Sequence, residues 1–175
     1  MANEIYRHYF KNDTKVKEFS YKEFKPIKNW EYTWVKPHGG LWASRLSSKL
    51  GWKEWCEDRE LNWCEGEFFD FYISDKANIL YLKNEDDIAK IIKEHANWVL
   101  QCTESLRFIR YLRDKEKYID DYPMIPSIIL NFQNILKDGV DALDVEIDKL
   151  YYPFFGWDCD STLIMNPDII ILKED

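Results

Sequence analysis

The sequence lacks most of the features that would assign a function directly. It has no apolar run close to the roughly 20 residues that span a bilayer, so we expect no membrane segment. Its first residues, Met1 to Glu4, lack the basic and apolar regions of a signal peptide. The motifs of P-loop ATPases, Rossmann dehydrogenases and α/β-hydrolases are also missing. These absences argue against three large enzyme classes and favour a cytoplasmic protein.

Cysteine is scarce, and its spacing carries no signature. The four cysteines, Cys56, Cys64, Cys102 and Cys159, form no CxxC pair, and with three histidines they fit no common zinc pattern. We therefore expect reduced thiols and no metal site.

Basic charge is in the minority, since the net charge is −8 and the pI is about 5.0. An acidic surface repels a phosphate backbone, so nucleic acid is a disfavoured partner. Aromatic residues, by contrast, make up 17% of the 175 residues. So many rings exceed what a core needs, and some are expected to line a pocket or a partner surface. The length predicts a single domain over 1–175.

Hydrophobic periodicity predicts an α+β fold with strands at both ends of the chain and helices inserted in the middle. The expected core is a split, mixed or antiparallel β-sheet. Strands are expected over 4–10, 26–35, 41–44, 68–74, 79–82, 140–147 and 161–172, the last with a kink at Asn166-Pro167. Helices are expected over 48–61, after the N-cap Asn84, over 103–115, and over 127–137 with a stop at Gly139.

The stretch from Lys36 to Ser44 has the most unusual composition. It contains two of the six glycines as the pair Gly39-Gly40, followed by Trp42 and Ser44. Glycine allows a ligand to approach the backbone, and Trp42 and Trp55 would add aromatic walls, which together suit a nucleotide-like ligand. His38 is a candidate acid or base. The alternative is a tight turn that leads into a core strand.

Three separate segments can be combined into one site. Arg7, in the first strand, could hold a phosphate, or it could pair with a carboxylate at the edge of the core. Ser44 could support a ribose. Asp158 and Asp160 precede the last strand and could stabilise an oxocarbenium-like state, or simply cap a turn. A second acidic pair, Asp144 and Glu146, competes for this role, the alternative being a solvated face of an edge strand.

These segments resemble the motifs of the ADP-ribosyltransferase-like superfamily. Ile5-Tyr6-Arg7 is similar to its aromatic–Arg start, residues 40–44 to its strand that ends on Ser, and residues 160–167 to the strand after its catalytic acid. The family carries Glu where this chain has Asp158-Cys159-Asp160. Residues 39–44 with 51–56 also resemble a stretch found in small uncharacterised bacterial and phage proteins.

The resemblance implies NAD as substrate, bound in a cleft between two sheets. Arg7, Ser44 and Asp160 would be catalytic, and His38, Gly39, Gly40, Trp42 and Trp55 would contact NAD together with Arg7. The implied activity is transfer of ADP-ribose to a macromolecular acceptor, expected to be a protein, or hydrolysis of NAD, as in a toxin or phage effector. The alternative is a non-enzymatic acidic module that binds or inhibits a protein partner.

Overall fold

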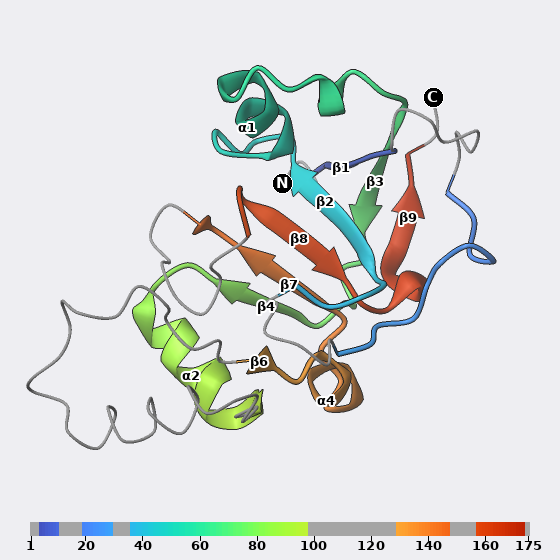
Figure 1. The fold of residues 1–175 in the computed structure, drawn as a ribbon. Coiled ribbons are helices and arrows are strands. Elements are labelled where there is room, and N and C mark those ends of the chain that lie inside the picture. The colour runs from blue at the N-terminus through green and yellow to red at the C-terminus, as the bar shows by residue number, and fades with distance from the viewer. Residues whose placement is uncertain (1–3, 11–18, 30–35, 98–128, 148–156, 174–175) are drawn as a thin grey trace, which may run out of the picture.

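The computed structural model describes residues 4–10, 19–29, 36–97, 129–147 and 157–173. Its centre is a curled seven-stranded mixed sheet with the order β4-β7-β8-β2-β1-β3-β9 (Figure 1). The strands are β1 (Tyr6–Tyr9), β2 (Leu41–Arg45), β3 (Phe68–Ile73), β4 (Ile79–Leu82), β7 (Ala142–Val145), β8 (Ser161–Ile164) and β9 (Ile170–Leu172). A two-stranded sheet joins β5 (Ala96–Asn97) to β6 (Ile129–Leu130).

Strand pairing brings distant parts of the chain together at the middle of the sheet. β2 pairs antiparallel with both β1 and β8, with Arg7 opposite Ser44 and Trp42 opposite Leu163. β1 also pairs with β3, where Arg7 lies opposite Asp70. β4 and β7 run parallel, which makes the sheet mixed. The three segments that the sequence suggested as one site therefore lie on neighbouring strands or directly before one.

Two helices each begin after an asparagine whose side chain satisfies backbone N–H groups. α2 (Glu85–His95) follows Asn84, whose side-chain oxygen accepts the N–H groups of Asp86 and Asp87. α4 (Phe132–Lys137) follows Asn131, which accepts the N–H of Asn134, and Gly139 ends it at a φ of +86°. The other helical segments within the described residues are α1 (Trp52–Asp58) and the 3-10 turns η1 (Asn62–Cys64) and η3 (Pro167–Ile169).

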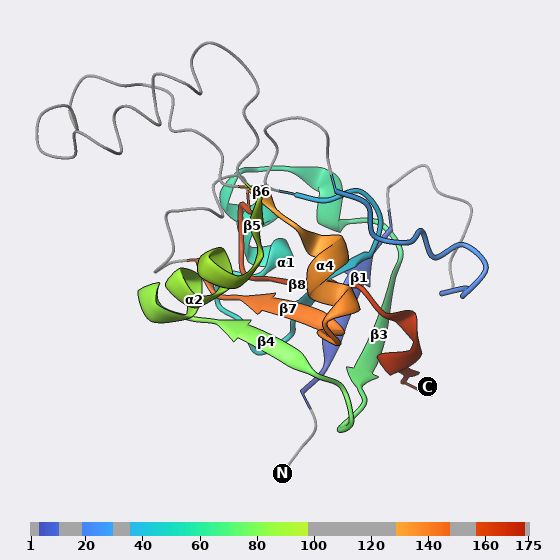
Figure 2. The same cartoon turned by 90° about the horizontal axis from the view of Figure 1, so that it is seen from below.

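The two faces of the sheet bury separate apolar clusters. α2 and α4 lie on one side of β4, β7 and β8 (Figures 1 and 2). Ile91 of α2 and Ile135 of α4 pack there with Leu143 and Val145 of β7. The other face holds a cluster made by the strands themselves and η3, with Tyr6, Leu41, Ala43, Phe71, Ala142, Ile164, Ile169 and Ile170. α1 lies apart from both, beyond the ends of β1 and β2 (Figure 1).

The α+β class and the mixed sheet are confirmed, and so is the kink at Asn166-Pro167, where η3 begins. The helix expected over 48–61 is shorter, because residues 48–51 form a loop and α1 begins at Trp52. The helix expected over 127–137 begins only at Phe132, since Ile129 and Leu130 pair with β5.

One expectation about the sheet is wrong. The alternative for Asp144 and Glu146 was an edge strand with a solvated face, but β7 lies between β4 and β8, and Asp144 is buried. The expectations for residues 30–35, 98–128 and 148–156, and for Cys102, fall outside the described residues. Within the described part, every helix is too short or too polar to cross a bilayer.

Candidate functional site

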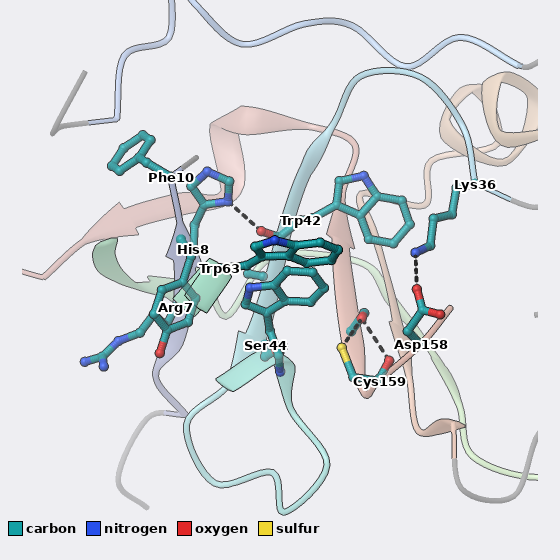
Figure 3. Close-up of a pocket in the computed structure, with 13 residues that line it drawn as sticks. Arg7, His8, Phe10, Lys36, Trp42, Ser44, Trp63, Asp158 and Cys159 are labelled. Atoms are coloured by element: carbon teal, nitrogen blue, oxygen red, sulfur yellow. Dashed lines mark hydrogen bonds and ion pairs between the residues drawn. The ribbon is translucent and has the colours of Figure 1, made fainter. Parts of the chain in front are cut away.

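A cavity of about 300 Å³ opens where β1, the middle of β2 and the segment that leads into β8 meet α1 and η1 (Figure 3). Its lining comprises Arg7, His8, Tyr9, Phe10, Lys36, Trp42, Ala43, Ser44, Trp52, Trp63, Asp158, Cys159 and Ser161. Six of these residues carry aromatic or imidazole rings. A small number of polar groups among aromatic walls is typical of a pocket for a flat ligand.

Three tryptophans line the cavity, Trp42, Trp52 and Trp63, and each contacts another aromatic ring. Trp52 stacks on Trp55 with ring centroids 5.2 Å apart and on Trp63 at 6.0 Å. Trp42 meets the buried Trp157 edge to face at 4.6 Å. Trp55 does not line the cavity, although the resemblance implied that it contacts NAD, but it supports Trp52 from behind.

Ser44 and Asp160 hold Trp52 in place. The Ser44 hydroxyl donates to the backbone oxygen of Asp160 at 2.9 Å and accepts the N–H of Trp52 at 2.9 Å. The Asp160 carboxylate accepts from the Ser48 hydroxyl at 2.6 Å and from the N–H of Ile147 at 2.8 Å. Ser44 lines the cavity and Asp160 does not. Both Asp160 oxygens are therefore occupied in joining the loop before α1 to the end of β7.

Arg7 lines the cavity, but its guanidinium is engaged elsewhere. It donates to both carboxylate oxygens of Asp70, at 2.7 and 2.9 Å, and lies 3.7 Å from the centroid of the Phe68 ring. The hydrogen bonds to Asp70 are the main reason that its pKa is raised. Figure 3 shows the guanidinium turned away from the tryptophans. The pairing with a carboxylate is the alternative that the sequence left open for Arg7.

Asp158 is the carboxylate on the cavity lining. Its Oδ2 accepts from Lys36 Nζ at 2.9 Å, and the same ammonium lies 5.8 Å from the centroid of the Trp42 ring. The side chains of Lys36 and Asp158 are 41% and 43% exposed, so this pair lies at the rim (Figure 3).

The buried thiol of Cys159 lies against Ser161, which donates to the Cys159 carbonyl at 2.9 Å. Burial raises the pKa of the Cys159 thiol. A protonated thiol is a poor nucleophile, so Cys159 contributes shape rather than covalent chemistry.

His8 is fixed by its backbone partner. Its Nδ1 lies 2.6 Å from the carbonyl oxygen of Trp42, which can only accept, so Nδ1 carries the proton. Phe10 and Phe69 contact the imidazole ring. Burial outweighs the Trp42 hydrogen bond and lowers the pKa of His8, which keeps the ring neutral.

The Gly39-Gly40 pair forms a tight turn that packs against other parts of the chain and does not line the cavity. The φ angles are +74° and +69°, and an added Cβ would overlap the Pro26 carbonyl at Gly39 and the Leu163 side chain at Gly40. His38 pairs with Lys28 through two backbone hydrogen bonds of 2.9 Å. His38, Gly39 and Gly40 do not line the cavity, so the turn into a core strand is what this stretch forms.

The second acidic pair lies on the other face of the sheet. Arg45 follows Ser44 in β2 and so points away from the cavity. Its Nη2 lies 3.2 Å from Asp144 and 3.0 Å from Glu146, and Lys83 lies 2.9 Å from Glu146.

The pKa values of these two carboxyl groups move in opposite directions. Burial raises the pKa of Asp144, although Arg45 and a 3.0 Å hydrogen bond from Thr162 oppose the shift. The hydrogen bond from Lys83, with that from Arg45, lowers the pKa of Glu146. Asp144 and Glu146 therefore belong to an ion network with Arg45 and Lys83 on the opposite face of the sheet, and they do not line the cavity.

Sequence reasoning did not single out His8, Lys36, Trp52 or Trp63 as site residues. The spacing Trp52-x-x-Trp55 puts both rings on one helix face and was an available signal, whereas the contact of Lys36 with Asp158 joins residues 122 positions apart. Comparisons with protein-family models, with curated proteins and with solved structures gave no match. Among the described residues, no group of three or more His, Cys, Asp or Glu could hold a metal ion.

Proposed function

We propose that the protein binds NAD, with one of its planar rings inserted in the aromatic pocket. The observation that carries the proposal is the cavity itself, in which Trp42, Trp52 and Trp63 surround space for a flat group beside a carboxylate and an ammonium. Its volume of about 300 Å³ is at the lower end for ligand pockets, so it accommodates one ring and its sugar rather than a whole dinucleotide.

The proposed reaction is cleavage of the bond between nicotinamide and ribose, with ADP-ribose passing to a macromolecule or to water. Such a step develops positive charge on the ribose, which a nearby carboxylate stabilises. Of the acids considered from the sequence, Asp158 lines the cavity, so we assign this role to it. Asp160 and Ser44 then act as positioning residues, because they hold the loop before α1.

A direct test is to titrate NAD into the protein while following tryptophan fluorescence and the melting temperature. Ligand at 100 times its Kd stabilises the folded state by about 2.7 kcal/mol, which is readily measured. Asp158→Asn should lose release of nicotinamide and weaken NAD binding without abolishing it, and Trp42→Leu should also weaken binding. No change with millimolar NAD would contradict the proposal.

A non-enzymatic protein-binding module is the second candidate. β9 is an edge of the main sheet and exposes Ile171 and Leu172, at 51% and 46%. An apolar edge strand is suited to pairing with a strand of another chain. This function is the one that remains if NAD leaves the protein unchanged.

A further inference from the structure

The pocket already contains a cation that belongs to the protein. The Lys36 ammonium lies 2.9 Å from the Asp158 carboxylate and 5.8 Å from the centroid of the Trp42 ring. All three residues line the cavity. A carboxylate beside the face of a tryptophan is the combination that proteins use to hold organic cations. Lys36 therefore sits where such a ligand would sit.

Separating the Lys36–Asp158 ion pair should cost little free energy. Ion pairs as exposed as this one contribute little to stability, since water solvates both partners when they separate. Arg7 is the other cation on the lining, and it remains bound to Asp70 and over Phe68. If Lys36 moves out, the Asp158 carboxylate is left facing the pocket beside the Trp42 ring, ready for an incoming positive charge (Figure 3).

We propose that the pocket selects a small, planar organic cation of the N-alkylpyridinium class, and that Lys36 is an internal competitor which the ligand displaces. The inference rests on the proposed function, because the pyridinium ring is the positively charged ring of NAD. It adds that recognition depends on the charge of the ring, through Asp158 and Trp42. Lys36 lowers the affinity of the pocket rather than contributing to it.

The experiment compares 1-methylnicotinamide, a cation, with nicotinamide, which has the same ring without the charge. Binding is measured by calorimetry and by quenching of tryptophan fluorescence. We expect the unmodified protein to bind the cation at least tenfold more tightly than the neutral ring. Lys36→Met keeps the aliphatic chain but removes the ammonium, and should strengthen binding of the cation about fivefold. Asp158→Asn should abolish the preference.

Lys53→Met is the matched control, since Lys53 forms an exposed ion pair with Glu57 on α1 and does not line the cavity. It should leave both affinities unchanged. Circular dichroism and melting temperatures establish that each variant is folded.

Equal affinity for the two rings would overturn the inference. Weaker binding of the cation by Lys36→Met would also overturn it, because Lys36 would then support the ligand. NAD binding without any preference for the cation would leave the proposed function intact and remove this inference alone. A preference for the cation without NAD binding would keep the selection of a cationic ring by the pocket and remove NAD as the ligand.

Discussion

At the scale of single residues, His8 is a group whose protonation we expect to lower the stability of the fold. Its Nδ1–H donates to the Trp42 carbonyl, and its ring is packed against Phe10 and Phe69. The lowered pKa means that the unfolded chain, with a histidine pKa near 6.5, binds a proton more readily than the folded protein. The stability from neutral His8 is thus fully present above pH about 6.5 and is lost as the pH falls through the folded-state pKa.

We predict that the melting temperature falls more steeply between pH 7.5 and 5 in the unmodified protein than in His8→Asn. Asparagine can still donate to the Trp42 carbonyl but does not titrate. Each unit by which the folded-state pKa is lowered corresponds to about 1.4 kcal/mol of this pH dependence. Melting curves over the pH range, followed by circular dichroism, measure the difference. Parallel profiles for the two proteins would show that His8 is not the titrating group.

At the scale of elements, the loop before α1 depends on one aspartate. The backbone N–H of Asp160 donates to the Leu50 carbonyl, and its carbonyl and carboxylate accept from Ser44, Ser48 and Ile147. α1 has no side-chain cap at Gly51, so these contacts, with the Ser44–Trp52 hydrogen bond, hold the start of the helix.

We predict that Asp160→Asn lowers the free energy of unfolding by about 1–3 kcal/mol, since one of the two accepting oxygens becomes an NH2 group, which cannot accept from Ser48 or Ile147. Asp158→Asn, two residues earlier on the exposed rim, should change it by less than about 1 kcal/mol. Urea unfolding of both variants makes the comparison. Equal effects would mean that the Asp160 carboxylate does not hold the loop. Ligand binding measured on the same samples separates lost structure from lost recognition.

Part of the secondary structure followed from local sequence, although α1 and α4 begin later than expected. Asn84 and Asn131 begin their helices because a short amide side chain accepts neighbouring N–H groups, and only the first of these was recognised. The strand expected over 4–10 contains β1, where side chains two positions apart share a face, as the contact of His8 with Phe10 shows.

The partners of the polar side chains did not follow from sequence. Arg7 and Asp70 are 63 positions apart, and nothing local favours that carboxylate over a phosphate. Asp144 looked like a residue of an edge strand because alternation cannot distinguish an edge strand from a central one. Its position depends on β4, which β7 joins in parallel. Of the residues considered for the site, Arg7, Ser44, Trp42 and Asp158 line the cavity and Asp160 does not.

At the scale of the whole molecule, the main sheet is open and has two edge strands. β4 and β9 are the outer strands, and Ile171 on β9 is 51% exposed. Open apolar edges promote pairing between chains, and natural proteins often place a lysine there.

We predict that Ile171→Lys decreases self-association at high concentration, as measured by sedimentation velocity. The change in stability should stay within about 0.5 kcal/mol, because the side chain is already exposed. Leu50→Lys, which replaces an exposed apolar residue outside the sheet, is the control and should have a smaller effect. If both variants associate to the same extent as the unmodified protein, the β9 edge is not a contact surface.

The order of strands in the sheet also determines when a newly made chain can fold. β2 pairs with β8, β3 with β9, and β4 with β7. Three strands from the first half of the chain therefore each need a partner strand from residues 142–172. On the ribosome, those early strands keep an unfilled edge until residues 142–172 have left the exit tunnel. We therefore expect the sheet to be completed only at that point, and to fold slowly, because these pairings join residues far apart in the sequence.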